Sequence, residues 1–276
     1  KLRPSDTAHP PIQIKNKTDI VEVKQMKNLL EFKNVSYFYQ TKESEVKALD
    51  NVTFNVQEKD FASLVGPSGC GKTTILSLIA GLLTPSSGEI ILDGKPIVKN
   101  DGRIGYMFQR DHLFEWRTIW QNIILGLEIQ KQHKNSEKLK LAEDLLKKYD
   151  LYNFKNKKPR QLSGGMRQRV ALIRTLVLEP SLLLLDEPFS ALDFQTRLKV
   201  CDDVYEIIKS EEKTALLVTH DISEALSMSD KIIILTKRPA TVKEKLEINF
   251  QGKTPLSKRE DKNFGNYFDK IWRNLC

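Results

Sequence analysis

The sequence predicts an α/β fold with a mostly parallel sheet, an antiparallel β subdomain and a helical subdomain. Short apolar runs typical of buried strands alternate with stretches of helical spacing, which implies crossover connections and a parallel sheet covered on both faces. In contrast, residues 110–180 contain almost no β-branched runs and are expected to be helical. The chain has 276 residues, 40% of them hydrophobic, which is enough for one large core.

The first predicted elements precede a glycine-rich turn. Residues 1–27 are polar and without periodicity, so we expect a flexible lead there. Apolar residues alternate in 29–35 and 48–56, which predicts two strands that pair antiparallel. Phe61–Val65 is a short apolar run that stops at a glycine, as a buried parallel strand would. A helix is expected over 72–82, where apolar residues recur at helical spacing.

The later elements complete the predicted domain. Ser136 is the expected N-cap of a helix that runs to Tyr149. Residues 104–108 are strand-like, and further strands are expected over 182–186, 215–219 and 231–235. Further helices are expected over 194–210 and 222–227. The predicted organisation is one domain over 28–248, a helical insert at about 110–180 within it, and a C-terminal tail over 249–276 with a short aromatic helix.

Composition and charge exclude several classes of protein. No apolar run approaches the roughly 18 residues that a membrane-spanning helix needs, and residues 1–18 lack the apolar core of a secretory signal. The three cysteines lie far apart, which fits neither a disulfide framework nor a metal-binding spacing. The net charge of +8 is compatible with nucleic acid or an anionic membrane surface, but the basic residues are scattered and favour a solvated surface.

A glycine-rich segment at residues 66–73 fits the pattern G-x-x-x-x-G-K-[ST] and lies between a predicted strand and a predicted helix. Glycines let the backbone wrap around a phosphate chain, and the N–H groups at a helix N-terminus favour the anion. Lys72 would add a positive charge near the β- and γ-phosphates, and Thr73 a hydroxyl for Mg²⁺. An ordinary strand-to-helix turn is the plainer alternative. The expected nucleotide-binding residues here are Gly66, Pro67, Ser68, Gly69, Cys70, Gly71, Lys72, Thr73 and Thr74.

Two carboxylates, Asp186 and Glu187, follow four apolar residues. A buried parallel strand would deliver Asp186 to the same sheet edge as the phosphate loop, where it could hold Mg²⁺ through water. Glu187 could then orient or deprotonate an attacking water. Taken alone, the pattern also fits a strand followed by a solvated acidic turn. Beside a phosphate loop, it predicts a catalytic pair.

A second anion site is predicted within residues 162–169. Ser163 precedes Gly164 and Gly165 at the start of a helical stretch, which would present exposed N–H groups and a hydroxyl. A plain capped helix start would explain Ser163 but not the two glycines, because glycine lowers helix stability. The sequence therefore predicts two phosphate sites in one chain.

The segment LSGGMRQ, which lies between the phosphate loop and LLLLDE, resembles the signature motif of ATP-binding cassette (ABC) proteins. The resemblance covers residues 28 to about 240. It implies an ABC-type P-loop NTPase core that binds ATP and Mg²⁺ and hydrolyses ATP. It also implies that two copies enclose two ATP molecules, with each phosphate loop facing the signature segment of the partner.

The same resemblance implies roles for single residues. Tyr39 matches the aromatic residue that stacks on adenine, although without the family the cluster 37–39 would be taken as core. Gln109 matches a glutamine that reaches Mg²⁺ and the attacking water, and Asp193 ends a loop that couples the two sites. His220 matches the histidine that contacts the γ-phosphate, whereas a lone histidine at a strand end is more often structural. The implied catalytic residues are Glu187, His220, Gln109 and Lys72, and the implied metal contacts are Thr73, Gln109 and Asp186.

Residues 110–127 are similar to a segment common in ABC proteins of the nitrate, sulfonate and taurine importer group. Residues 236–240 and an aromatic helix fit that group too; the helix is marked by Phe264, Phe268, Ile271 and Trp272. The resemblance implies import of a small solute, powered from the cytoplasmic face of the membrane. The implied partners are integral-membrane permease subunits, a second copy of this chain and, indirectly, an extracytoplasmic substrate-binding protein.

Three other functions remain open from the sequence. A soluble ABC-type ATPase acting on nucleic acid would usually carry a coiled coil, zinc modules or a second cassette, none of which is visible, so no nucleic-acid partner is expected. An ABC exporter subunit is the second alternative. The third is a regulator that binds nucleotide without turnover, which Glu187 and His220 argue against.

Overall fold

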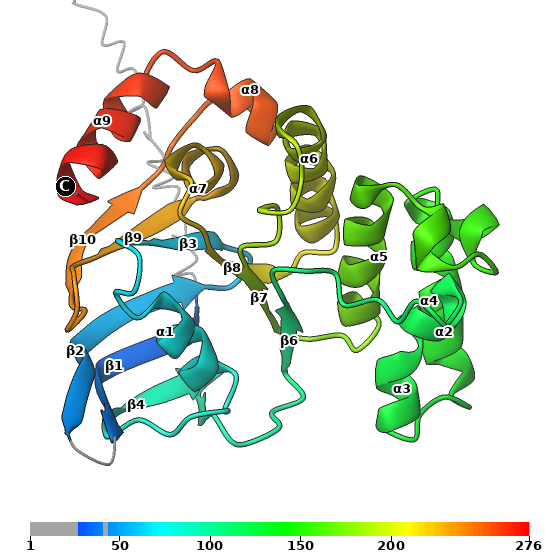
Figure 1. Cartoon of the computed structure of the whole chain (residues 1–276), viewed down its shortest axis with the longest axis horizontal. Coiled ribbons are helices and arrows are strands. Elements are labelled where there is room, and N and C mark those ends of the chain that lie inside the picture. The colour runs from blue at the N-terminus through cyan, green and yellow to red at the C-terminus, as the bar shows by residue number, and fades with distance from the viewer. Residues whose placement is uncertain (1–26, 41–43, 276) are drawn as a thin grey trace, which may run out of the picture.

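The computed structural model describes residues 27–40 and 44–275, so nearly all of the expected lead lies outside the described residues. Its centre is a six-stranded sheet in the order β10-β9-β3-β8-β7-β6 (Figure 1). These strands are β3 (Phe61–Val65), β6 (Ile104–Met107), β7 (Leu182–Asp186), β8 (Thr214–Val218), β9 (Lys231–Leu235) and β10 (Val242–Glu247). All neighbours pair in parallel except β10 with β9, which confirms the mostly parallel sheet.

Two strands of this sheet differ from the prediction. Strand β8 begins and ends one residue earlier than expected, because Thr219 has left the ladder and its hydroxyl donates a hydrogen bond to Glu224. Strand β10 was not predicted at all. It lies at the sheet edge, and every second side chain along it is charged and exposed. It therefore lacks the apolar pattern of a buried strand.

A separate antiparallel sheet forms the predicted β subdomain, in the order β2-β1-β4-β5. Strands β1 (Asn28–Gln40) and β2 (Glu45–Gln57) pair antiparallel as predicted, and both run beyond the expected bounds. Strands β4 (Ser87–Leu92) and β5 (Lys95–Pro96) were missed. The first half of β4 is exposed and rich in turn-forming residues, and it is a strand because it pairs with β1.

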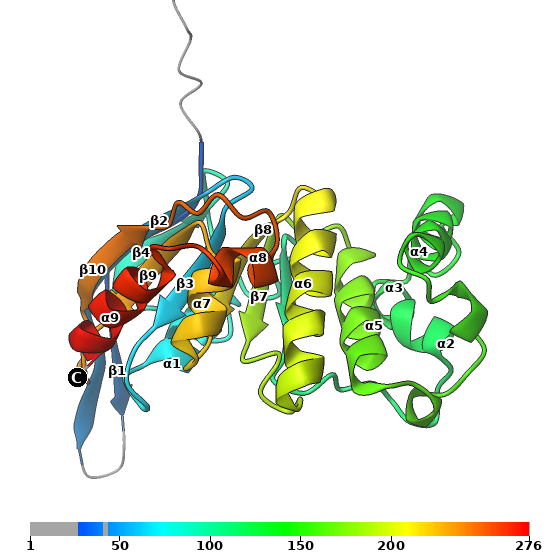
Figure 2. The ribbon, with the colours of Figure 1, turned by 90° about the horizontal axis from the view of Figure 1, so that it is seen from above.

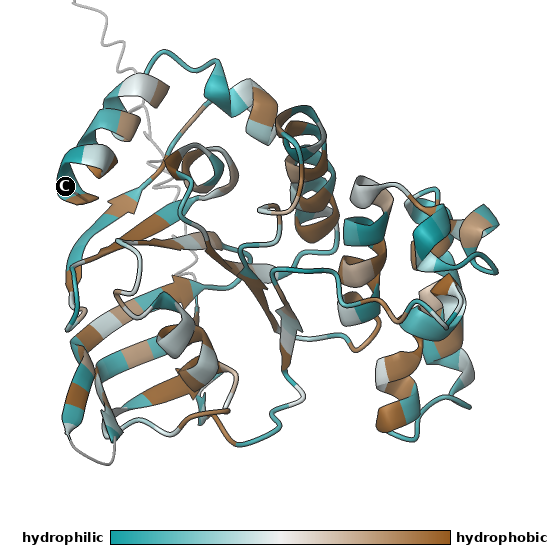
Figure 3. Cartoon of the chain, in the orientation of Figure 1, coloured by the Kyte–Doolittle hydropathy of each residue, from teal (hydrophilic) through white to brown (hydrophobic). Residues whose placement is uncertain are grey.

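The layers follow from side chains that alternate across the central sheet. In β7, Leu182 and Leu184 face a core shared with the antiparallel sheet and helix α1 (Lys72–Ile79). Leu183 and Leu185 face the other core, which contains α6 (Phe194–Ser210). Figure 3 shows these central strands as hydrophobic. Both faces of the strand are covered, as the unbroken apolar run requires.

The end of one helix and the N-cap of another differ from the prediction for reasons that the local residues explain. Helix α1 stops three residues before the expected end, because Gly81 adopts a left-handed φ of 68° directly after the C-cap. Helix α4 (Ser136–Lys148) is capped by Asn135 and not by Ser136. The Asn135 side chain accepts hydrogen bonds from the backbone N–H groups of residues 137 and 138, which makes Ser136 the first helical residue.

The predicted helical segment lies at one end of the molecule, beyond α6 (Figure 2). It contains α2 (Ile119–Ile123), α3 (Leu125–Ile129), α4 and α5 (Gly164–Leu176), with 3₁₀ turns η1 (Tyr152–Phe154) and η2 (Pro159–Gln161). Its apolar residues, among them Leu127 and Leu146, join the core beneath β7. The subdomain is therefore packed on the sheet through one continuous core.

The C-terminal segment folds back onto the sheet through α7 (Ile222–Met228), α8 (Pro255–Arg259) and α9 (Phe264–Leu275). The predicted aromatic helix is α9, and its Ile271 is fully buried with Leu226 and Ile232. No helix within residues 27–40 and 44–275 combines the length and apolar character that crossing a membrane requires.

Candidate active site

The phosphate loop joins β3 to α1, as the sequence predicts. Lys72 has an exposed fraction of 8%, and its Nζ donates hydrogen bonds to the carbonyl oxygens of Gly66, at 2.7 Å, and Pro67, at 3.1 Å. An ammonium group has three N–H donors, so these two bonds leave one donor for a further acceptor. The buried cation is thus held at the loop and can accept an anionic partner.

The backbone around Lys72 has the geometry of an anion cradle. Gly71 is the N-cap of α1, with a φ of 122° that disfavours any residue with a side chain. A Cβ atom at Gly71 would also lie 2.9 Å from Leu49 Cδ2. No side chain caps α1, so the N–H groups of its first turn remain available to a phosphate group.

The other residues of the loop lie around this cradle. Ser68, Gly69 and Thr73 are exposed, and Pro67 is half-buried. Cys70 is almost fully buried, and its burial raises the pKa of the thiol. This environment disfavours the thiolate, so Cys70 fills space in the loop and is not a nucleophile.

Asp186 ends β7 at the same sheet edge as the phosphate loop. Burial raises the pKa of its carboxyl group, opposed by a hydrogen bond from the Tyr106 hydroxyl to Oδ2 at 3.0 Å and by the charge of Lys72. No group of three His, Cys, Asp or Glu side chains that could hold a metal occurs in the described ranges. The Asp186 carboxylate and the Thr73 hydroxyl instead fit Mg²⁺, which is usually bound by one or two carboxylates together with phosphate oxygens and water.

Glu187 and His220 lie together beside Asp186. Glu187 has a positive φ of 44°, and its backbone N–H donates to the Val218 carbonyl at 2.8 Å. Its Oε2 lies 3.2 Å from Nδ1 of His220, and its carbonyl accepts a hydrogen bond from the Ser190 hydroxyl. The unusual backbone conformation is therefore fixed from two sides, which holds the carboxylate at the open edge of the sheet.

Gln109 lies at the predicted edge of the sheet. It is exposed, two residues beyond β6, and the pairing of Met107 with Leu185 brings the ends of β6 and β7 side by side. Within the described part of the chain, no hydrogen bond joins Gln109 to Asp186 or Glu187.

Tyr39 and Tyr37 have different surroundings. Tyr37 packs against the hydrophobic core, whereas Tyr39 is 37% exposed and meets Tyr37 edge-on at 4.9 Å between ring centroids. The Tyr39 hydroxyl is 3.0 Å from the Thr74 hydroxyl in the first turn of α1. The ring is thus tied to the phosphate loop and is not a core side chain.

The predicted second anion site lies elsewhere in the molecule. Ser163 caps α5, and its Oγ accepts a hydrogen bond from the Met166 N–H at 3.4 Å. Figure 2 shows α5 on the far side of α6 from α1, and in Figure 1 strands β7 and β6 lie between α1 and α5. The chain therefore does not bring Ser163, Gly164 and Gly165 to its own phosphate loop.

The structure adds a packing reason for a glycine at position 165. A Cβ atom there would lie 2.8 Å from Val200 Cγ2, so the glycine permits close approach of α5 to α6. Asp193, predicted to couple two sites, is the exposed N-cap of α6, and its Oδ1 accepts from the Thr196 N–H at 3.0 Å. That hydrogen bond with Thr196 lowers the pKa of Asp193.

Sequence reasoning missed an arginine that joins two segments near the site. Arg197 donates from Nη2 to the Leu192 carbonyl at 3.0 Å, and its Nη1 lies 3.8 Å from Asp221 Oδ2 and 3.7 Å from Glu224 Oε1. Glu224 has an exposed fraction of 3% and also accepts from the Thr219 hydroxyl. These contacts involve Thr219 and Asp221, the residues on either side of His220. Because Arg197 is distant from them in the sequence, no short motif predicts the contacts.

A second missed contact links the segment after Gln109 to α5. Arg167 donates from Nε to Asp111 Oδ2 at 2.7 Å and from Nη2 to Asp111 Oδ1 at 3.2 Å. The same guanidinium lies 2.9 Å from Glu115 Oε1. A two-point bond of this kind fixes orientation as well as distance.

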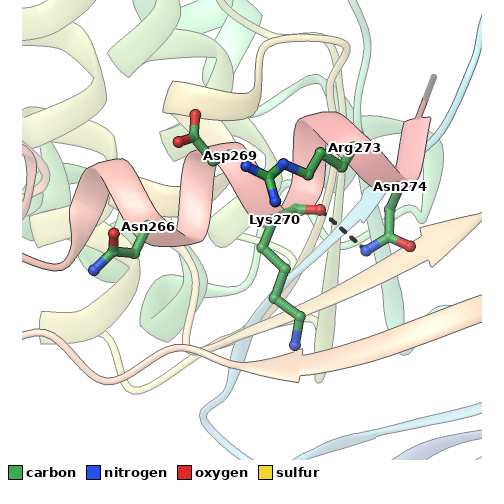
Figure 4. A pocket seen from close by; sticks show the side chains of 5 residues that line it. All are labelled: Asn266, Asp269, Lys270, Arg273 and Asn274. Carbon is green, nitrogen blue, oxygen red and sulfur yellow. Dashed lines mark hydrogen bonds between the residues drawn. The ribbon is translucent and has the colours of Figure 1, made fainter.

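A hollow of about 390 Å³ lies away from the phosphate loop, on the polar face of α9 (Figure 4). It is lined by Asn266, Asp269, Lys270, Arg273 and Asn274. Lys270 and Asn274 already bond to Glu244 of β10. The hollow is therefore a surface feature where α9 meets β10, without the convergent groups of the sheet edge.

Comparison with known proteins agrees with this geometry. The family model described as ABC transporter matches residues 49–190. The uncharacterized ABC transporter ATP-binding protein YtlC of Bacillus subtilis is 43% identical over 250 residues, 90% of this chain and 96% of that protein. The nitrate import ATP-binding protein NrtD of Synechocystis is 37% identical over 248 residues, 88% of this chain and 93% of that protein.

A solved structure extends the likeness to three dimensions. It is a dimeric ATP-binding cassette in a post-hydrolysis state, bound to ADP and phosphate. It aligns with a TM-score of 0.64 at 34% identity, over 80% of this chain and 99% of that one. The chain belongs to the ABC transporter family, as an ATP-binding subunit that hydrolyses ATP.

Proposed function

We propose that this chain powers the import of a small solute through separate integral-membrane permease subunits. The observation that carries the ATP-hydrolysing part of the proposal is the convergence of Lys72, Asp186, Glu187 and His220 at one edge of the sheet. The name of the nitrate import relative supports import of nitrate or a solute like it. The likeness of residues 110–127 to the nitrate, sulfonate and taurine importer group extends the proposal to a sulfonate or taurine. An extracytoplasmic substrate-binding protein would supply the solute.

Each of the residues at the sheet edge has its own role in ATP hydrolysis. The backbone of residues 66–73 and the free donor of Lys72 bind the β- and γ-phosphates. Thr73, Asp186 and Gln109 would hold Mg²⁺, which neutralises charge on the phosphates when bound. Glu187 orients and deprotonates the attacking water. His220, held beside Glu187, contacts the γ-phosphate.

A second copy completes the site in this proposal. Ser163 and the two glycines after it, which lie away from their own phosphate loop, face the ATP bound by the partner. The two-copy state of the related cassette supports this arrangement. Asp193, at the start of α6, lies where the two sites would be coupled. Tyr39 stacks on the adenine.

An aromatic patch supports docking of a permease subunit. We use this name for Phe114 and Trp116, which are both exposed, with Trp116 at 71%. The rings of Phe114 and Trp116 stack at 4.7 Å between centroids. Exposed aromatic clusters mark surfaces that bind partners. A cytoplasmic helix of the permease would cover the patch and hold the chain at the cytoplasmic face of the membrane.

The activity is tested by Glu187→Gln, which keeps the shape of the side chain and removes its basic oxygen. We expect ATP binding to persist and hydrolysis to fall by about 10² or more, as for loss of a general base. Exposed Glu212 on the opposite end of the fold supplies the matched control Glu212→Gln. Hydrolysis at the unchanged rate in Glu187→Gln would refute the assignment of the base.

The transport role is tested by co-purification. Tagged wild-type protein should retain a permease from membranes of its source, whereas Trp116→Ala should lose it while keeping ATP binding. Equal retention by both proteins would contradict docking at the aromatic patch. Added DNA or RNA should leave the rate of ATP hydrolysis unchanged; stimulation by either would favour a nucleic-acid function.

A further inference from the structure

The hairpin between β9 and β10 lies directly behind the phosphate loop. Its Ala240 is fully buried and forms a bridge with Leu49 of β2. The Ala240 N–H donates to the Ala48 carbonyl, and the Asp50 N–H donates to the Ala240 carbonyl, both at 2.9 Å. These bonds fix residues 236–241 to the antiparallel sheet.

The same contacts place the hairpin next to the nucleotide cradle. A Cβ atom at Gly71 would touch Leu49 and would lie 3.8 Å from Ala240 Cβ. Inside the hairpin, Thr236 Oγ1 accepts from the Thr241 N–H at 2.9 Å, which closes the turn. The hairpin therefore has a fixed position relative to the phosphate loop.

Arg238 projects from this hairpin over the ring of Tyr39. Its guanidinium carbon lies 5.9 Å from the ring centroid. The one hydrogen bond recorded for its side chain within residues 27–40 and 44–275 is the long contact of 3.4 Å from Nε to the Lys47 carbonyl. Arg238 is exposed, so its position over the ring is set by the hairpin and not by burial.

We infer that Arg238 is a second base-contacting residue, and that the adenine of ATP binds between the Tyr39 ring and the Arg238 guanidinium. The inference rests on the proposed role of Tyr39 as the stacking residue. Two stacked layers need about 7 Å, twice the roughly 3.5 Å of van der Waals contact. The observed 5.9 Å is close to this value, and a long exposed side chain can move by the remaining distance.

The chemistry of the two side chains suits a purine. A guanidinium is planar and weakly hydrated, so it stacks on flat ring systems, and an aromatic ring on the opposite face adds its own stacking. The contact is made to the base alone. It should therefore contribute to affinity for ATP and contribute nothing to affinity for a phosphate chain without a base.

The test compares ATP with inorganic tripolyphosphate as ligands of the full chain. Both are titrated by calorimetry with Mg²⁺ removed, so that ATP is not consumed. We expect Arg238→Ala to weaken ATP binding by about three- to tenfold, the range for loss of one stacking or cation–π contact. Tripolyphosphate binding should not change. Lys237→Ala, which removes a neighbouring exposed charge of the same hairpin, is the matched control and should leave both unchanged.

Two further variants separate stacking from simple charge. Arg238→Lys keeps the positive charge without the planar group and should weaken ATP nearly as much as Arg238→Ala. In a Tyr39→Ala background, Arg238→Ala should have little further effect, because the two residues act on one base. Full recovery by lysine, equal weakening of tripolyphosphate, an undiminished effect without Tyr39, or unchanged ATP binding in Arg238→Ala would each overturn the inference.

Failure of the inference can be told apart from failure of the proposed function. Lys72→Ala should weaken both ATP and tripolyphosphate if the phosphate loop binds nucleotide. If it weakens neither, the proposed function fails whatever Arg238 does. If it weakens both while Arg238→Ala changes neither, only the inference about the base is wrong.

Discussion

Glu224 is a buried carboxyl group four residues after His220, which contacts Glu187. The surroundings of Glu224 determine whether it is charged. Burial raises its pKa, while the Thr219 hydroxyl and the charges of Arg197 and His220 oppose this rise. Arg197 is the cation within reach of its carboxylate, at 3.7 Å. Removing that cation leaves a charge that burial already disfavours, which is costly in a protein interior.

Arg197→Met should therefore lower the free energy of unfolding by about 3 kcal/mol near neutral pH. It should also raise the pKa of Glu224 further. A carboxyl group whose pKa is higher in the folded state binds more protons there, so stability is lost as pH rises above the pKa of the unfolded chain. The loss caused by the substitution should thus be larger at about pH 7.5 than at about pH 5.

Urea unfolding of both proteins at the two pH values measures this difference. The control is Arg160→Met, at an exposed arginine of the helical subdomain, which should stay within about 0.5 kcal/mol of wild type. An equal loss at both pH values would show that Glu224 does not respond to Arg197.

Residues of the candidate site were predictable where one short segment carries the chemistry. Lys72, Asp186 and Glu187 are of this kind, because a strand end or a glycine-rich turn fixes where each must lie. Tyr106 and Asp186 are 80 residues apart and meet only because β6 pairs with β7. Arg197, Glu224 and Arg238 share this limitation, since tertiary packing alone brings each to its partner.

Among the elements, apolar strands were predicted well and polar ones were not. The runs at β3, β7 and β9 are buried on both faces, so composition alone marks them. The charged strand β10 and the half-exposed β4 are strands because a neighbour pairs with them, and that pairing is not a property of their own residues.

Hydrogen bonds fix helix α5 to the segment that follows β6. Arg167 and Asp111 join the two by a two-point hydrogen bond, and Arg174 of the same helix donates to the carbonyl oxygens of Asp111 and His112. The aromatic patch and the signature segment should consequently move as one body.

Asp111→Asn should weaken this link by removing the charge that Arg167 pairs with. We expect the free energy of unfolding to fall by about 1 to 3 kcal/mol, the range for a hydrogen bond to a charged group. Denaturant unfolding measures the change, with Asp144→Asn on the exposed side of α4 as the control. A loss no larger than that of the control would contradict a stabilising role for the link.

At the scale of the whole molecule, the separation of Ser163 from its own phosphate loop predicts that ATP binding causes the chain to dimerise. In a Glu187→Gln background, ATP should convert the chain from monomer to dimer, as measured by light scattering after gel filtration. Ser163→Arg should prevent the dimer, because a large cation would occupy the place of the partner's phosphates.

Ser136→Arg is the matched control, since Ser136 is also an exposed serine at the start of a helix in the same subdomain. It should leave the ATP-dependent dimer intact. A dimer that forms equally well with Ser163→Arg would refute the shared site.

The position of the Lys72 ammonium group has an energetic consequence beyond catalysis. Its removal from water takes place when the chain folds, because the Gly66 and Pro67 carbonyls already hold it. Nucleotide then meets a cation that has already lost most of its water, and the free chain carries most of the cost of dehydration. The buried cation therefore lowers the stability of the nucleotide-free chain while it prepares the site for binding. Binding of nucleotide should restore this stability, as a rise in the melting temperature.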